Sequence, residues 1–398
     1  MTTAELLRAR TAVVVVFIAN GLAFSSFISR TPAIRETLGL SPGQLGLLLL
    51  CLSGGAVTGL PLSGPLVHRL GPGRSVLLGT LSAAVGLACL GAGLLNAAVA
   101  PAAIGLFLTG LGSGVWDVAM NVEGADVERR LGRSLMPRLH AAFSLGTVGG
   151  AGLGAASAAT GIPLAAQVLA VAVLLPVAVA VAVRWFGATA AAAAERPSQE
   201  GAHSAWREPR TLLIGLLVLG FAFTEGSANE WIAFAVVDGY GASEALGAVA
   251  FGVFVSAMTL GRLAGGSVLE RFGRVVALRA TAGIALVGLL LVLLGGSTPV
   301  ALVGAVFWGL GAALGFPVGM SAAADDPARA ASRVSVVSSI GYTAFLGGPP
   351  LIGMLAERVG ILNALFVVLA ALLLGALAAG AARPLRTPVS DPASPPVR

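Results

Sequence analysis

Long apolar runs of about 20 residues, separated by short polar segments, constrain this chain more than any other feature of its sequence. A bilayer core about 30 Å thick needs roughly 20 apolar residues per helix, and only helices and closed barrels satisfy the backbone inside it. The runs therefore predict membrane-spanning helices. Twelve are expected, with these approximate limits: 11–34, 43–65, 75–96, 100–122, 139–160, 163–184, 210–234, 245–268, 276–296, 299–321, 336–357 and 361–382.

The composition supports an integral membrane protein, because 57% of the 398 residues are hydrophobic and only 11% are charged. All 24 basic residues are arginine, which together with abundant Ala and Gly suggests a bacterial coding sequence. An even number of spans places both termini on one side, and 20 of the arginines fall on that side. Because arginine-rich segments stay in the cytoplasm, we expect an inner-membrane protein with cytoplasmic N- and C-termini.

The longest polar break divides the predicted spans into six and six. We expect an N-terminal six-helix half over 1–185, a cytoplasmic linker over 186–209, a C-terminal half over 210–382 and a disordered, proline-rich tail over 383–398. Internal repetition supports the division, since GPLVHRLG from Gly64 matches GSVLERFG from Gly266, 202 residues later. Duplicated halves with a site between them suit alternating access.

The repeated loop resembles the signature of the major facilitator superfamily, a family of transporters. The resemblance implies an all-α membrane protein with 12 transmembrane helices in two pseudo-symmetric six-helix halves, acting as a monomer. It also implies a cytoplasmic loop latch made of Gly64, Arg69, Gly71, Arg74, Glu270, Arg271, Gly273 and Arg274. His68 stands where the family usually has Asp, which places the first copy of the latch in question.

Four shorter strings resemble the MosC-like group of this superfamily, which lies near the sugar permeases. They are SRTPAIRETLGLS from Ser29, DVAMNVEG from Asp117, LHAAFSLGT from Leu139 and EGSANEW from Glu225.

Asp117 and Asn121 are four residues apart, so they share one face of the fourth predicted span. An ionised Asp facing lipid costs roughly 2.5 to 3.5 kcal/mol even on the mild insertion scale, so this face should meet protein or water. The pair suits hydrogen bonding to a polar substrate or proton coupling. A hydrogen-bonded clasp between helices is the structural alternative. His140, at the start of the fifth span, is either a proton relay to Asp117 or an interfacial histidine.

Glu225 and Asn229 share a face of the seventh span, and the repeat relates Asn229 to Arg30 in the first span. The resemblance brings these two helices face to face, so Arg30 with Glu225 or Glu230 is a candidate gate near the outer side. Snorkelling of Arg30 to the interface is the alternative. Trp231, beside Glu230, is a candidate for stacking on a sugar ring.

The sequence contains no phosphate-binding loop and no metal-ligand cluster, and its arginines form no patch suited to nucleic acid. We therefore expect no cofactor, no metal and no enzymatic activity. The leading hypothesis is a proton-coupled symporter of a small polar solute, a sugar or a cyclitol. The alternatives are an exporter of amphipathic drugs or metabolites and a transport-inactive membrane sensor or scaffold.

Overall fold

The computed structural model describes residues 3–132, 135–186, 205–326 and 329–384. Most of the predicted linker (186–209) and of the predicted disordered tail (383–398) therefore lies outside the described residues. The described chain is helical and contains no strand.

The N-terminal bundle is built from seven helices: α1 (Thr3–Ile28), α2 (Thr31–Leu38), α3 (Pro42–Leu70), α4 (Pro72–Leu95), α5 (Val99–Leu131), α6 (Met136–Ala159) and α7 (Leu164–Val183). The C-terminal bundle comprises α9 (Pro209–Tyr240), α10 (Glu244–Leu294), α11 (Thr298–Ala312), α12 (Gly315–Ala323), α13 (Ala330–Val359), α14 (Ile361–Ala364), α15 (Phe366–Leu377) and the 3₁₀ helix η2 (Ala378–Ala382).

These helices provide the twelve predicted membrane crossings. Within the described ranges, nine helical segments are long and apolar enough to span a bilayer. One of them, α10, has 51 residues and is interrupted by non-helical geometry at Gly273, so it crosses twice. The more polar helices α6 and α13 supply the remaining two crossings.

Turn glycines reveal the pseudo-symmetry of the two halves. Gly39 and Gly241 have φ of 62° and 65°, and Gly71 and Gly273 have φ of 79° and 72°. Each pair is 202 residues apart. Positive φ is accessible to glycine at little cost because it lacks a Cβ. The repeat seen in the sequence therefore reproduces the same backbone turns.

Three predicted spans are interrupted, among them 361–382, which is divided into α14, α15 and η2. Span 11–34 breaks after Ile28, and α2 begins at Thr31 with Arg30 at its N-cap. Span 299–321 breaks at Ala313 and Leu314, between α11 and α12. The first break turns α2 across the end of the bundle, where it contacts α9.

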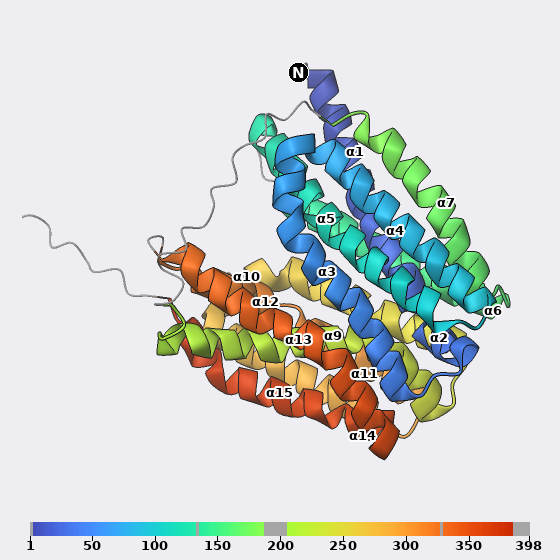
Figure 1. The fold of residues 1–398 in the computed structure, drawn as a ribbon. Coiled ribbons are helices and arrows are strands. Elements are labelled where there is room, and N and C mark those ends of the chain that lie inside the picture. Colours follow the sequence, from blue (N-terminus) through green and yellow to red (C-terminus); the bar gives the residue numbers. More distant parts are fainter. Residues whose placement is uncertain (1–2, 133–134, 187–204, 327–328, 385–398) are drawn as a thin grey trace, which may run out of the picture.

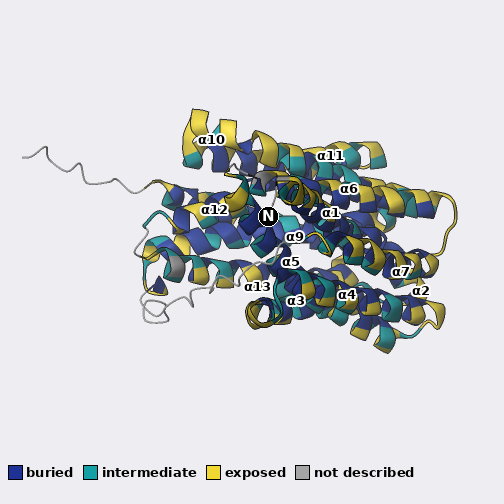
Figure 2. Ribbon diagram, turned by 90° about the horizontal axis from the view of Figure 1, so that it is seen from above, coloured by how far each residue is buried: buried dark blue, intermediate teal, exposed yellow. Residues whose placement is uncertain are grey.

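Exposed residues lie at the periphery of the molecule, whereas buried residues gather between the helices (Figure 2). Many of the exposed residues are large and hydrophobic. On α7, for example, Val173, Leu174 and Val177 are more than half exposed. A surface of this kind is stable only in contact with lipid, which agrees with a multi-pass membrane protein.

The two bundles meet at one end and diverge toward the other (Figure 1). We call the end where α7 finishes and α9 begins the linker face, and the end where α1 finishes and α7 begins the opposite face. Near the opposite face α3 and α13 pack closely through small residues, since a Cβ on Gly46 would collide with the Pro349 backbone and one on Gly353 with the Pro42 carbonyl.

Candidate functional site

An ion pair between the two bundles closes the opposite face. Arg30 donates from Nε to Glu244 Oε1 at 2.5 Å and from Nη2 to Glu244 Oε2 at 2.9 Å. Its Nη1 donates to the Ile162 carbonyl at 2.9 Å and to Gln167 Oε1 at 3.0 Å. Only 3% of Arg30 is exposed. Arg30 therefore pairs with Glu244, at the start of α10, and not with Glu225 or Glu230, whereas its role as a gate residue stays a prediction.

Further contacts join the bundles at the same face. Arg35 pairs with Asp238 at 2.6 Å, and its guanidinium lies over the Phe234 ring. Glu357, near the end of α13, accepts hydrogen bonds from the Ser41 hydroxyl and the Gly43 amide at the start of α3. These contacts extend the closure from α1 across α2 to α3.

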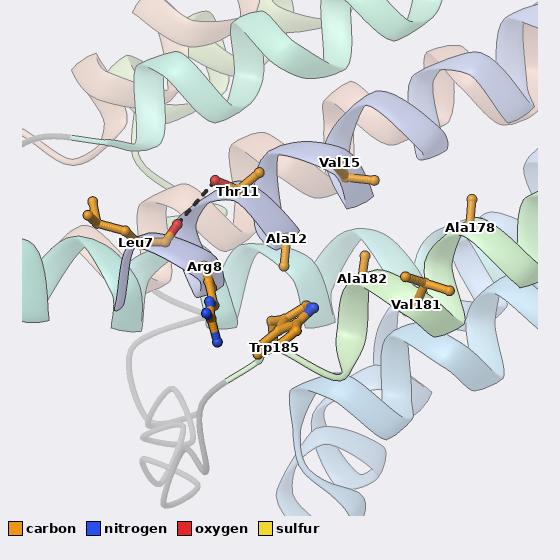
Figure 3. A pocket seen from close by; sticks show the side chains of 9 residues that line it. All are labelled: Leu7, Arg8, Thr11, Ala12, Val15, Ala178, Val181, Ala182 and Trp185. Carbon is orange, nitrogen blue, oxygen red and sulfur yellow. Dashed lines mark hydrogen bonds between the residues drawn. The ribbon is translucent and has the colours of Figure 1, made fainter. Parts of the chain in front are cut away.

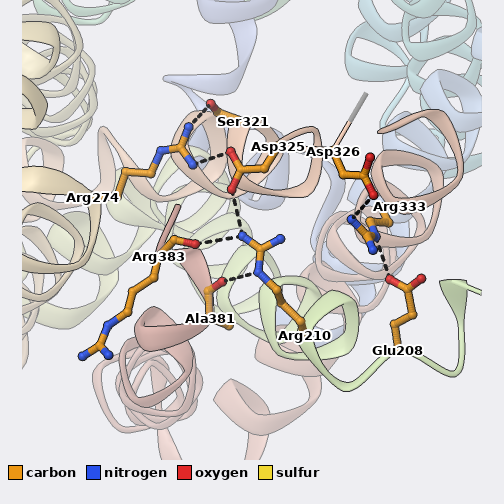
Figure 4. A network of polar contacts seen from close by, with 9 residues as sticks. All are labelled: Glu208, Arg210, Arg274, Ser321, Asp325, Asp326, Arg333, Ala381 and Arg383. Atoms are coloured by element: carbon orange, nitrogen blue, oxygen red, sulfur yellow. Dashed lines mark hydrogen bonds and ion pairs between the residues drawn. The ribbon is translucent and has the colours of Figure 1, made fainter. Parts of the chain in front are cut away.

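At the linker face, the ion pairs among the described residues stay within one bundle. In the C-terminal bundle, Arg210 and Arg274 both bind Asp325, at 2.8 and 2.6 Å (Figure 4). Glu208 binds Arg333 and Arg329, at 2.6 and 2.7 Å. The Arg333 guanidinium beside Glu208 lowers the pKa of that carboxyl to about 2, with help from Thr211 and Arg329.

A cavity of about 750 Å³ lies between the bundles toward the linker face. Its walls come from α5 and α6 on one side and from α10 and α12 on the other. Apolar surface dominates the lining, with a few polar side chains: Asp117, His140, Ser144, Thr259, Arg262, Arg274 and Ser321. A mostly apolar cavity with a few placed polar groups is typical of a small-molecule site.

Asp117 is exposed to this cavity. Asn121, one turn further along α5, donates from Nδ2 to the Asp117 carbonyl at 2.8 Å and to its Oδ1 at 3.3 Å. The predicted polar face of this span therefore meets the cavity rather than lipid.

Arg262 forms the opposite polar wall and is the site residue that sequence reasoning missed. It pairs with Glu225 of α9 at 2.8 Å, and it lines the same cavity as His140. The sequence feature that could have identified Arg262 is its position inside a predicted span, because an arginine within the membrane needs a partner. Asp117, Asn121, His140 and Glu225 are thereby brought into one polar zone.

Three predicted residues lie away from this zone. Glu230 is only 8% exposed and Trp231 is fully buried, packed edge-on against Phe234. Asn229 is partly buried. None of them lines the cavity, so their predicted roles stay predictions.

The two copies of the loop latch differ. In the second, Arg274 ties α10 to α12 through Asp325 and the Ser321 hydroxyl, while Glu270 is exposed and Arg271 lies over the Phe272 ring. In the first, Gly71 makes the turn and Arg69 and Arg74 are exposed, as are Gly64 and His68.

This architecture is that of a known class. The family model of the Major Facilitator Superfamily matches residues 13–342 and 231–397. The chain belongs to this superfamily, and it is a multi-pass membrane transporter rather than an enzyme.

The relatives agree with this assignment. The uncharacterized transporter y4wD of Sinorhizobium fredii is 32% identical over 370 residues, covering 90% of this chain and 96% of the relative. The membrane protein MosC of Rhizobium meliloti is 26% identical over 361 residues, covering 90% and 86%. The expected resemblance to MosC is confirmed. A crystal structure of the nucleoside transporter NupG (D323A mutant) superposes with a TM-score of 0.77 at 14% identity, covering 94% of this chain and 98% of NupG. At that identity the likeness concerns the fold alone.

Proposed function

We propose that this chain is a proton-coupled secondary transporter of a small polar solute, such as a sugar or a cyclitol. It works by alternating access, with residues 1–185 and 210–382 moving as two units around the cavity. The observation that carries the proposal is the position of Asp117. Its carboxylate faces a cavity that lies between both bundles, toward the linker face, while ion pairs close the opposite face.

The chemistry of the cavity suits a polar solute with an apolar body. The mostly apolar walls favour a ring face, while Asp117 and Arg262, which contact Asn121 and Glu225 respectively, offer a hydrogen-bond acceptor and donors. A carboxylate in a cavity open to one solution can also exchange a proton with that solution. Asp117 thus combines substrate binding with proton coupling.

The distribution of arginines supports one orientation of the protein in the membrane. With the arginine-rich linker face in the cytoplasm of a bacterial cell, the structure is the inward-facing state of an inner-membrane protein. Arg30 and Glu244 then form part of the periplasmic gate.

The first experiment is thermal stabilisation of the purified protein across sugars, cyclitols, amino acids and hydrophobic cations at two pH values. A ligand at a hundredfold excess over Kd stabilises by about 2.7 kcal/mol. The hit is then tested in proteoliposomes with an imposed pH gradient. We expect gradient-driven uptake to fall at least tenfold in Asp117→Asn and to persist in Glu36→Gln, an exposed acid on α2.

Two results would replace the proposal. Stabilisation by hydrophobic cations alone, with efflux of those cations, would favour the exporter. Specific binding of a polar solute without any flux would favour the sensor or scaffold. Uptake that persists in Asp117→Asn with unchanged pH dependence would refute proton coupling through this residue.

A further inference from the structure

Two surface grooves flank the end of α7 at the linker face, outside the cavity between the bundles. One, of about 500 Å³, lies between α1 and α7 and is walled by Leu7, Val15 and Val181 (Figure 3). The other, of about 660 Å³, lies between the α3–α4 turn and α7 and is walled by Leu70, Leu77 and Phe186. Both grooves therefore open on the lipid-facing surface, where a spanning helix ends.

Each groove carries arginine at its rim. Arg8 lies over the Trp185 ring at 4.8 Å in the first, and Arg74 and Arg184 line the second. All three arginines are exposed, and none is in an ion pair with another described residue. The rim is thus a cationic surface with no internal counter-charge in the part of the chain that is described.

The corresponding arginine of the other half does have a counter-charge. Arg274 directly follows its turn glycine, whereas Pro72 and Gly73 separate Arg74 from Gly71, so the two arginines correspond at an offset of 200 residues, and Arg274 is neutralised by Asp325. The same offset places Ala125 at the position of Asp325. The N-terminal half has therefore kept the cation without its carboxylate, and an external anion can take the vacant role.

We propose that these grooves bind an anionic phospholipid. The apolar walls accept acyl chains, and the phosphate is held at the level of the interface by Arg8 beside Trp185 in the first groove and by Arg74 with Arg184 in the second. Charge complementarity selects an anionic headgroup over a zwitterionic one. The apolar walls select a lipid over a free phosphate ion, because only a lipid buries them.

Native mass spectrometry of the full chain in detergent tests this, with dioleoyl phosphatidylglycerol and dioleoyl phosphatidylcholine as probes. Each arginine near an anionic surface contributes about 1 kcal/mol, or about fivefold in affinity. The double variant Arg74→Gln/Arg184→Gln, which removes both arginines of the second groove, should therefore weaken phosphatidylglycerol binding there about 25-fold, and Arg8→Gln should weaken binding at the first groove about fivefold. The matched control Arg279→Gln/Arg358→Gln removes two exposed arginines elsewhere and should leave the affinity unchanged.

A second variant separates lipid from ion. Ala178→Trp fills the first groove without changing charge and should weaken phosphatidylglycerol binding while leaving the fold intact, since Ala178 is exposed. Three results would overturn the proposal: equal affinity for phosphatidylcholine, an equal loss in the control double variant, or full displacement of the lipid by inorganic phosphate with no effect of Ala178→Trp. These measurements of binding do not depend on whether the chain transports a solute.

Discussion

Arg30 and Glu244 are 214 residues apart in the chain and form a two-pronged ion pair between the two bundles. Arg30 is almost fully buried, and the Ile162 carbonyl and Gln167 hold its remaining nitrogen. Two parallel hydrogen bonds fix the orientation of the guanidinium as well as adding energy. The pair therefore fixes how the two bundles are placed relative to each other while the opposite face is closed.

Replacing Glu244 with Gln should open the opposite face more often. Breaking a buried pair costs about 3 to 5 kcal/mol, but Glu244 is 29% exposed and Arg30 keeps two other acceptors. We expect a net shift of about 1.4 kcal/mol, which is tenfold in population. The rate at which an impermeant maleimide alkylates Thr31→Cys, a fully buried position, measures this shift in population. The native cysteines are removed by Cys51→Ala and Cys89→Ala. Unchanged alkylation relative to Glu36→Gln would contradict the gate assignment.

Gly46→Val should destabilise the conformation in which the opposite face is closed, because of a steric clash. Its side chain would collide with the Pro349 backbone of α13, and overpacking of this kind costs about 1 to 3 kcal/mol. Spin labels at Glu36 and Arg358, both exposed near the opposite face, should report longer separations. Gly54→Val is the matched control, because a Cβ there meets no atom within 4 Å. Identical distance distributions in both variants would rule out this steric role.

Glu225 and Arg262 should be energetically coupled. Removing either charge leaves its partner unpaired within the membrane. The losses of unfolding free energy in the two single Gln variants should therefore add up to more than the loss in the double variant. Contacting residues typically couple by about 0.5 to 3 kcal/mol, and a value near 1 is expected. A double-mutant cycle on thermal unfolding measures it. The more exposed Arg35–Asp238 pair, with side chains 32% and 40% exposed, should couple less. An additive result at Glu225 and Arg262 would show that the pair contributes no net energy.

Glu208 should stabilise the protein in a pH-dependent way. Its pKa is lowered from 4.5 to about 2, so its contribution is complete above about pH 4.5 and disappears as the pH falls toward 2. Solvent screening at this face limits the contribution to about 1 kcal/mol. Glu208→Gln should therefore unfold more easily than the wild type at neutral pH, and the two melting curves should converge in acid. A difference that persists near pH 2 would assign the effect to packing instead.

The sequence predicted the spans well because the length and hydrophobicity of a span are local properties. It missed the helix breaks at Arg30 and at Ala313, although Pro32 follows the first break and Pro317 follows the second, because the apolar run continues past both prolines. The turn at Gly273 falls between two predicted spans, as the sequence indicated.

The candidate site was predicted only in part, because residues far apart in the sequence contribute to it. Asp117 and Asn121 were found because their spacing on one helix is enough to align them. The sequence did not reveal Glu244 as the partner of Arg30. Glu244 lies one residue before a predicted span, and a carboxylate at the end of a helix is usually in contact with water. Such pairings between bundles depend on the tertiary arrangement, which hydrophobic periodicity does not encode.

The two helix breaks are distributed unequally between the halves. The break between α1 and α2 corresponds in the repeat to Ala228 and Asn229 of the continuous α9, and the break between α11 and α12 to Ser113 and Gly114 of the continuous α5. One break lies at the closed face, and the other lies beside the cavity, where Leu314 and Phe316 line it. The closed face and the cavity wall thus each contain one of these two breaks, contributed by a different half. We predict that stiffening one of them slows one half of the alternating-access cycle more than the other, which would separate solute exchange from net accumulation.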